Sequence, residues 1–152
     1  CIFIDLFAGS GGIGIEALSR GASHAYFVEN DKEAISCILD NLSFTKFFDS
    51  ATLLKQDVFS ALSIISEKEA DVIFIDPPYQ AGYEEKIFMM LKQQPYVTEN
   101  TLLILEAQLH MDMEFLQKLD FTVVKEKKYK TNKHVFVRKG DLDESSNLSR
   151  KF

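Results

Sequence analysis

The stretch CIFIDLFAGSGGIG, residues 1–14, decides the fold because an apolar run leads directly into a cluster of glycines. Gly9, Gly11 and Gly14 form a G-x-G-x-x-G pattern after a predicted strand and at the start of a predicted helix. Glycine lets the backbone turn tightly and approach a ligand closely, and the amide groups of a helix that begins there can bind it. The stretch therefore predicts a strand, a ligand-binding turn and a helix.

The rest of the chain alternates apolar strand-like runs with segments whose apolar residues recur at helical spacing. Nearly continuous apolar strands between helices are typical of a parallel sheet with helices on both faces and right-handed crossovers. The last two strands are too close in sequence for a parallel crossover, so they are predicted to form a hairpin that adds one antiparallel strand. We therefore predict a Rossmann-like α/β fold with a mostly parallel, seven-stranded sheet. The predicted strands are 2–7, 25–29, 51–55, 71–75, 101–106, 121–127 and 134–138, and the predicted helices are 13–20, 31–47, 59–66, 84–93 and 113–119.

Length and composition favour one folded domain. The chain has 152 residues, of which 46% are hydrophobic and 26% charged, an ordinary globular balance. We expect the domain to span residues 1–140, and the polar stretch over 141–152 to be a flexible tail. No apolar run approaches the roughly 18 residues needed to span a bilayer, and no basic leader precedes the first strand. We therefore expect a monomeric, cytoplasmic protein without membrane contacts.

The charge of the chain is unevenly spread. The net charge of −6 argues mildly against a protein that coats itself with nucleic acid. Residues 125–139, however, are strongly basic and contain a single acid, Glu126. This stretch has two interpretations, a surface for phosphates or a solvated pair of strands. Its basic residues are Lys125, Lys127, Lys128, Lys130, Lys133, Arg138 and Lys139.

Acidic residues lie at the ends of the first three strands, where open α/β sheets bind their ligands. Glu29 comes 20 residues after Gly9, the interval at which a carboxylate can accept hydrogen bonds from both hydroxyls of a ribose. Asp57 follows the third strand and is interpreted as a partner of an adenine amino group, as a helix N-cap, or as both. Asp5 lies just before the glycines and could serve an ammonium group, directly or through water, or merely cap its strand. Together these acids predict an adenosine-type ligand.

Two ligands of this type compete, a nicotinamide dinucleotide and S-adenosylmethionine. The dinucleotide needs the glycine turn to hold a pyrophosphate. S-adenosylmethionine carries no phosphate but has an ammonium group and a positively charged sulfur, so it favours acids near the turn. The acids tip the balance toward S-adenosylmethionine, with S-adenosylhomocysteine as its product. The predicted cofactor-binding residues are Asp5, Phe7, Gly9, Ser10, Gly11, Gly14, Glu29, Asn30, Asp57 and Val58.

The tetrapeptide Asp76-Pro77-Pro78-Tyr79, directly after the fourth strand, indicates the chemistry. Two prolines fix φ, so the segment is a stiff platform that carries a carboxylate, an unpaired Pro77 carbonyl and an aromatic ring. Asp76 Oδ and the Pro77 carbonyl can accept both hydrogens of a base amino group and direct its lone pair at a sulfonium methyl. Tyr79 can stack on a base that is extruded or single-stranded. We predict that these four residues are catalytic.

These motifs resemble the RsmD family of bacterial methyltransferases, which make N2-methylguanine in small-subunit (16S) ribosomal RNA. The resemblance covers residues 2 to about 139 and rests on segments 5–22, 28–31, 56–57 and 76–79. It implies that ribosomal RNA or the small ribosomal subunit is the partner. It also implies a further segment before the first cofactor strand, which members of the family carry. By resemblance, Gly9, Ser10, Gly11 and Gly14 cradle the cofactor, Glu29 binds its ribose, Asp57 meets its adenine, and residues 76–79 hold the target guanine.

Several other functions stay open at this point. An adenine-N6 methyltransferase of DNA or RNA would use the same platform, and a methyltransferase-like module could bind without turnover. Enzymes that methylate a protein glutamine amide usually have Asn where this chain has Asp76, and a nicotinamide dehydrogenase has no evident use for the platform. The three histidines, His24, His110 and His134, show no metal-ligand spacing and are expected at the surface or in the core, so no metal is predicted.

Overall fold

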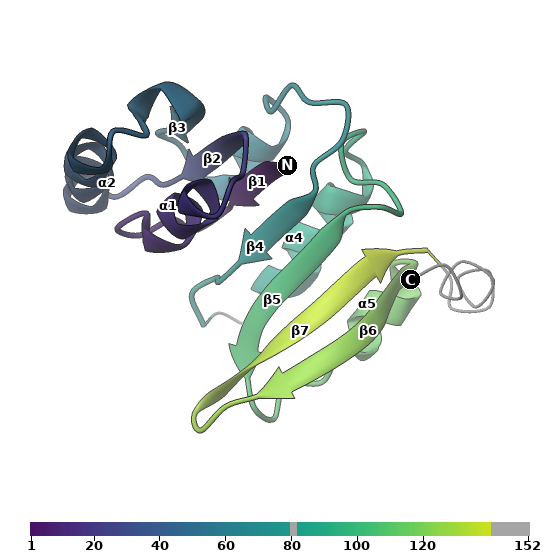
Figure 1. Cartoon of the computed structure of the whole chain (residues 1–152). Coiled ribbons are helices and arrows are strands. Elements are labelled where there is room, and N and C mark those ends of the chain that lie inside the picture. The colour runs from purple at the N-terminus through teal and green to yellow at the C-terminus, as the bar shows by residue number, and fades with distance from the viewer. Residues whose placement is uncertain (80–81, 141–152) are drawn as a thin grey trace.

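One sheet of seven strands, in the order β3-β2-β1-β4-β5-β7-β6, organises the computed structural model, which describes residues 1–79 and 82–140 (Figure 1). All neighbouring strands pair in parallel except at β7, which is antiparallel to β5 and to β6. The predicted fold class is therefore confirmed, including the single antiparallel strand. The strands are β1 (Ile2–Asp5), β2 (His24–Val28), β3 (Ala51–Leu54), β4 (Val72–Ile75), β5 (Leu102–Gln108), β6 (Phe121–Lys128) and β7 (Asn132–Lys139).

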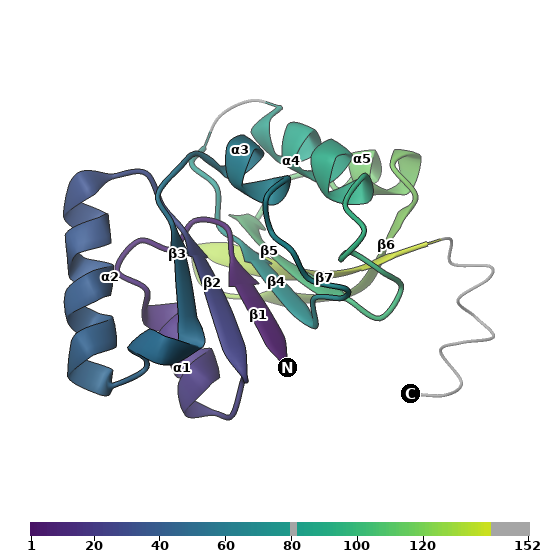
Figure 2. The same ribbon diagram turned by 90° about the horizontal axis from the view of Figure 1, so that it is seen from above.

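Helices cover both faces of the sheet, as Figure 2 shows. On one face, α1 (Gly12–Ser19) and α2 (Lys32–Thr45) pack Leu18, Ile38 and Leu42 against β1 and β2. The side chain of Asp31 caps α2 by accepting a hydrogen bond from the amide of Ala34. The other face is covered by α3 (Val58–Leu62), α4 (Tyr83–Lys92) and α5 (Glu114–Lys118). No helix among residues 1–79 and 82–140 is long and apolar enough to cross a membrane.

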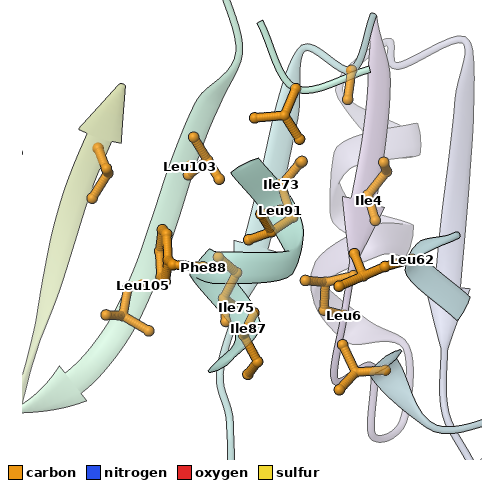
Figure 3. Packing of buried hydrophobic residues seen from close by; sticks show 14 of the residues in the cluster. Ile4, Leu6, Leu62, Ile73, Ile75, Ile87, Phe88, Leu91, Leu103 and Leu105 are labelled. Atoms are coloured by element: carbon orange, nitrogen blue, oxygen red, sulfur yellow. The ribbon is translucent and has the colours of Figure 1, made fainter. Parts of the chain in front are cut away.

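The main core lies between the sheet and the α3–α5 layer. Figure 3 shows Ile4, Ile73 and Leu103 facing the helical residues Ile87 and Leu91, and all five are fully buried. Side chains alternate between the two faces of a strand, so the residues next to these core positions point toward the α1–α2 side. This alternation places the carboxylate of Asp5 on the α1–α2 side of the sheet, the side that also holds Phe3.

The structure differs from the predicted elements mainly at their ends. The predicted helix over 59–66 ends at Leu62, and a short 3-10 helix, Phe48–Ser50, precedes β3 without a sequence signal that announces it. The hairpin strands are longer than predicted, because Lys128 pairs with Lys133 and only residues 129–131 connect them. The predicted flexible tail over 141–152 lies outside the described residues.

Part of the basic stretch serves the fold. Lys133 is buried and binds both the Glu126 carboxylate (3.0 Å) and the Met111 carbonyl (3.0 Å). Arg138 donates to the Asn100 carbonyl, and Lys139 donates to two further backbone carbonyls. The remaining four lysines, Lys125, Lys127, Lys128 and Lys130, are exposed on the hairpin. The two interpretations of the basic stretch, a phosphate-binding surface or a solvated pair of strands, therefore concern only these four lysines.

We predict that Gly14→Ala destabilises the protein through a clash between α1 and β2. A Cβ at Gly14 would lie 2.3 Å from Cε2 of the buried Phe27 ring, so helix and strand would have to separate. Overpacking of this kind costs about 1–3 kcal/mol. Urea unfolding should show that loss for Gly14→Ala.

Gly12→Ala is the matched control, because a Cβ there meets only the Ser10 hydroxyl at 3.8 Å. Its unfolding free energy should equal that of the parent or exceed it, since alanine favours helices over glycine by about 1 kcal/mol. Equal effects of the two substitutions would contradict the packing role of Gly14.

Candidate active site

The predicted site residues gather at one edge of the sheet. Parallel strands β1 to β5 all end on that edge, and β1 lies between β2 and β4, where the strand order reverses. Asp5 pairs with Phe27 on one side and with Phe74 on the other. Glu29 lies two residues beyond Phe27, and Asp76 lies two residues beyond Phe74. The two acids therefore flank the glycine turn from both sides. Such a reversal point is where doubly wound sheets bind ligands.

Glu29 holds the glycine turn in place through hydrogen bonds to the backbone. Its Oε1 accepts a hydrogen bond from the Gly9 amide (2.9 Å), and its Oε2 accepts from the amides of Asn30 (3.2 Å) and Asp31 (3.0 Å). Gly9 and Gly11 have φ values of 58° and 85°, a left-handed region that favours glycine. The carboxylate is thus oriented by three backbone donors, and its remaining lone pairs are available to a ligand.

A small pocket of about 50 Å³ opens beside Glu29, at the ends of β1, β2 and β3. Five predicted cofactor residues line it: Phe7, Glu29, Asn30, Asp57 and Val58. A larger hollow of about 560 Å³ lies between α5 and β6, but no predicted site residue lines it. Two of the strand-end acids, Glu29 and Asp57, line the smaller pocket, and Glu29 also accepts a hydrogen bond from the Gly9 amide of the glycine turn.

The structure confirms that Asp57 is a helix N-cap. Its Oδ1 accepts from the Ser60 amide (3.0 Å) and its Oδ2 from the Ser60 hydroxyl (3.0 Å), so it caps α3. These hydrogen bonds to Ser60 lower the pKa of Asp57, which is therefore a stable carboxylate at neutral pH. The predicted contact with an adenine stays a prediction.

Tyr83 is a pocket residue that the sequence reasoning missed. It begins α4, lines the pocket, and places its ring 6.0 Å from Phe7 and 5.5 Å from Phe59 between centroids. Burial, followed by the charge of Asp57, raises the pKa of Tyr83, so its hydroxyl stays protonated. No local pattern marks this tyrosine, because only the packing of α4 against the strand ends brings it to the pocket.

Asp5 is a buried acid beneath the glycine turn. Its side chain is 1% exposed, and its Oδ1 accepts a hydrogen bond from the Phe7 amide (3.1 Å). Burial raises the pKa of Asp5 to about 7, the Phe7 amide opposes this, and the charges of Asp76 and Glu29 raise it further. These couplings bring the three carboxyl groups into one electrostatic cluster. With so little exposed surface, Asp5 would act on a ligand mainly through its charge or through water.

The Asp76–Tyr79 platform projects from the end of β4. Pro77 is buried, whereas Tyr79 is 69% exposed and free to meet a planar ligand. Burial of the carboxyl, followed by the charge and hydrogen bond of Glu106, raises the pKa of Asp76 to about 6. Among residues 1–79 and 82–140, no hydrogen bond to the Pro77 carbonyl is present. The Pro77 carbonyl is therefore available as an acceptor in the described part of the chain.

The structure gives Gly14 and Ser10, two predicted cofactor residues of the glycine turn, contacts that the sequence did not predict. Gly14 lies buried inside α1 against Phe27, so the structure gives it a packing role, and its contact with a cofactor stays a prediction. Ser10 is exposed, and its carbonyl accepts a hydrogen bond from Asn41 Nδ2 (2.9 Å). Gly11 caps α1 without a side chain, so the amides of the first turn have no side-chain acceptor.

The site is strongly negative. Asp5, Glu29, Asp57 and Asp76 form no ion pair with a lysine or arginine in the described part of the chain. Within residues 1–79 and 82–140, no group of three or more His, Cys, Asp or Glu is arranged to hold a metal ion. Carboxylates that lack a paired cation favour a positively charged ligand.

We predict that Asp5 makes the protein less stable as the pH rises. The folded pKa is about 7 and the ordinary value is 3.8, so between these limits folded Asp5 keeps a proton that unfolded Asp5 has lost. The free energy of unfolding should fall across this window, by at most about 1.4 kcal/mol per pH unit from this group. Asp5→Asn, which keeps an oxygen for the Phe7 amide, should flatten the dependence measured by urea unfolding from pH 5 to 8. The exposed substitution Asp49→Asn serves as control, and an unchanged slope in Asp5→Asn would refute the assignment.

Comparisons with known proteins agree with this geometry. The family model described as "Conserved hypothetical protein 95" matches residues 1–138. The Bacillus subtilis protein YlbH is 33% identical over 112 residues, which are 72% of this chain and 61% of YlbH. "Ribosomal RNA small subunit methyltransferase D" of Haemophilus influenzae is 31% identical over 129 residues, which are 82% of this chain and 64% of the relative. The chain thus spans less than two thirds of the length of these relatives.

Solved structures share the whole architecture. A conserved hypothetical protein of Streptococcus pyogenes is 31% identical, superposes with a TM-score of 0.82, and covers 91% of this chain and 85% of its own. A methylase structure from Haemophilus influenzae is 27% identical with a TM-score of 0.78. The sheet has the class I methyltransferase topology. Family model, sequence relatives and fold converge: the chain belongs to the family of conserved hypothetical protein 95, which is the RsmD family that its motifs resemble.

Proposed function

We propose that this chain is the catalytic core of an S-adenosylmethionine-dependent methyltransferase that methylates the exocyclic N2 of a guanine in small-subunit (16S) ribosomal RNA. One observation carries the proposal: the Asp76–Tyr79 platform and the Glu29-held glycine turn end adjacent strands, β4 and β1, at the same edge. The name of the Haemophilus relative supports ribosomal RNA as the substrate. The resemblance to the RsmD family supports guanine N2 as the target atom.

The residues present fit S-adenosylmethionine. Glu29 offers a preset carboxylate for ribose hydroxyls, and the pocket next to it is lined by Phe7 and Val58, whose apolar surfaces suit an adenine. Asp5 and Asp76 add negative charge that no lysine or arginine of the described chain neutralises, which favours the cationic end of the cofactor. When bound, S-adenosylmethionine supplies a methyl group on a positively charged sulfur.

The platform prepares the target nitrogen. A base amino group is a poor nucleophile because its lone pair is delocalised into the ring. Asp76 Oδ and the Pro77 carbonyl would accept its two hydrogens and favour a pyramidal nitrogen whose lone pair points away from both acceptors. The exposed ring of Tyr79 would stack on the base and fix its plane. For this task Asp76 must be ionised, so the rate should fall as the pH drops below about 6.

RNA contact would use the exposed lysines of the hairpin. Lys127 lies over the Tyr129 ring at 5.6 Å from its centroid, and Lys125 lies over Phe136 at 5.7 Å. These ammonium groups are held by aromatic rings and not by carboxylates, so their charge remains available to phosphates. Lys127 pairs with His134 on β7, and His134 pairs with Glu106 near the end of β5, so the lysines lie toward the same edge of the sheet as Asp76. From there they would bind phosphates of an RNA whose base is held at Asp76.

We predict that the cofactor and target roles separate in variants. Asp76→Ala should reduce methyl transfer by at least about 100-fold while leaving S-adenosylhomocysteine affinity within about threefold, because only the target loses an acceptor. Glu29→Ala should weaken that affinity by about tenfold or more, because it removes the ribose partner and frees the Gly9 amide. Calorimetry and transfer of labelled methyl to small-subunit RNA, assembled subunits and DNA provide the measurements.

Glu33→Ala, an exposed substitution in the first turn of α2, is the matched control and should change neither quantity. Mass spectrometry of the labelled nucleosides should identify N2-methylguanine. Label on adenine N6 would replace the proposed target, and binding of NAD in place of S-adenosylhomocysteine would overturn the proposed cofactor.

A further inference from the structure

One face of the sheet near the platform has no helix over it in the described part of the chain. Helices α1 and α2 pack over β1, β2 and β3, but they do not extend over the same face of β5, β7 and β6 (Figures 1 and 2). On β7, Val135 and Val137 belong to the core on the opposite side, so His134 points to the open face. The strand register sets His134 between Glu106 of β5 and Lys127 of β6, close to the ligand edge. The open face therefore carries a row of polar side chains beside the platform.

Tyr129, in the turn between β6 and β7, adds an exposed aromatic ring to this row. Its amide donates a hydrogen bond to the Asn132 carbonyl (2.8 Å), so backbone contacts close the turn. The chain has five tyrosines, all within the described residues, and only Tyr79 and Tyr129 are exposed. An exposed aromatic ring next to a proposed nucleic-acid site is a candidate stacking surface.

The Tyr129 ring is restrained by a chain of contacts. The His134 ring packs edge-on against it, with 4.9 Å between centroids and 67° between planes. His134 is held in turn by Glu106, whose Oε1 lies 3.0 Å from its Nε2, and by an edge-on contact with Phe74 at 5.9 Å between centroids. The side chains of Glu106 and His134 are each only 25% exposed. A ring that is already restrained loses less conformational entropy when a ligand stacks on it.

Lys127 supplies a cation next to this ring. Its Nζ lies 5.6 Å from the Tyr129 centroid, near the outer limit for a cation–π contact, and it forms no ion pair in the described part of the chain. A base that stacks on Tyr129 can displace the ammonium, because the lysine stem is flexible and can turn to the phosphate of that nucleotide. An aromatic face next to a cation is the combination with which proteins bind single-stranded nucleic acid.

The proposed reaction leaves a neighbouring base without one of its stacking partners. A base held at Asp76 is extruded or single-stranded, so the next base along the RNA loses the partner on one of its faces. An aromatic side chain can replace that partner. Strand β7 lies two strand spacings from β4, roughly 10 Å, so a ring on the β6–β7 turn would meet the next nucleotide and not the target itself.

We propose that Tyr129, held by His134 and flanked by Lys127, is a stacking site for a nucleotide next to the target base in single-stranded RNA. Tyr129 and Lys127 contact the RNA, and His134 is a positioning residue that acts through the Tyr129 ring. The site selects RNA in which the neighbour of the target is unpaired, because a base inside a duplex keeps both of its faces stacked. The inference rests on the proposed function, which places the target base at Asp76.

Equilibrium binding of RNA tests this site without any methyl transfer. The ligand is a fluorescently labelled, single-stranded oligoadenylate of about ten nucleotides with one central guanine, and its affinity is measured by fluorescence anisotropy at several salt concentrations. Tyr129→Ala should lower the affinity about tenfold without changing its salt dependence, because a base loses its stacking surface but no phosphate contact is lost. Tyr129→Phe keeps the ring and should stay within about twofold of the parent.

Variants of the flanking residues separate the roles within the site. Lys127→Ala should reduce the slope of log affinity against log salt by about one, because it removes one phosphate contact. His134→Ala should lower the affinity about threefold in the parent but no further in Tyr129→Ala, because His134 acts only through the ring. A merely structural loss at His134 would appear in both backgrounds. Phe44→Ala, which removes an 88% exposed ring on α2, is the matched control and should change neither affinity nor slope.

Full RNA affinity in Tyr129→Ala, or a parent that binds a duplex of the same length as tightly as the single strand, would overturn the stacking site. Should Tyr129→Ala fail to fold, Tyr129→Leu removes the ring while it keeps apolar bulk, and the same loss is expected. Labelled methyl transfer by the parent distinguishes the two proposals. Transfer with full RNA affinity in Tyr129→Ala would refute only the stacking site. A loss of affinity in Tyr129→Ala without any transfer by the parent would refute only the proposed function.

Discussion

The pairing of β1 between β2 and β4 is the constraint on which the site depends. Leu6 continues this pairing past the end of β1 by donating its amide to the Phe74 carbonyl at 3.0 Å, and Ala8 donates to the Val28 carbonyl at the same distance. The glycine turn is therefore anchored to both neighbours before it bends away. A slip of one residue on either side would turn Asp5 into the α3–α5 core and move Asp76 away from the turn. Register, more than any single side chain, creates the site.

The same register concentrates acids where a protein can least easily keep them charged. Burial, together with the charge of Asp76, raises the pKa of Asp5 to about 7, and burial, together with Glu106, raises the pKa of Asp76 to about 6. Glu29 is stabilised as a carboxylate by hydrogen bonds that it accepts from three backbone amides. A ligand with an ammonium group and a sulfonium would relieve the repulsion between these carboxyl groups. This repulsion therefore favours a cationic ligand.

Features encoded by neighbouring residues were predictable from the sequence. The N-caps Asp31 and Asp57, the strand–turn–helix around Gly9 and the antiparallel position of β7 all follow from local patterns, and the structure confirms them. The pattern also included Gly14, but its reason, the ring of Phe27 at 2.3 Å from a would-be Cβ, comes from a strand that begins ten residues later.

Features created by long-range packing had no such signal. His134 reads as an isolated histidine because its partner Glu106 is 28 residues away and is brought opposite only by the β5–β7 register. Tyr83 reaches the pocket only through the packing of α4. The sequence also could not show which lysines of the basic stretch are buried, because the buried Lys133 and the exposed Lys130 look the same in sequence. The sequence predicts that the functional residues lie at the strand ends, and the strand order and register determine which of them lie close together.

We propose that the nucleoside-holding turn and the amino-accepting platform form one site at the junction of β1, β2 and β4. A crystal structure with bound S-adenosylhomocysteine tests it most directly. We expect the ribose hydroxyls on Glu29, the adenine between Phe7 and Val58, and the sulfur facing Asp76 and the Pro77 carbonyl. Product bound in the hollow between α5 and β6, or with its sulfur turned away from Asp76, would contradict it.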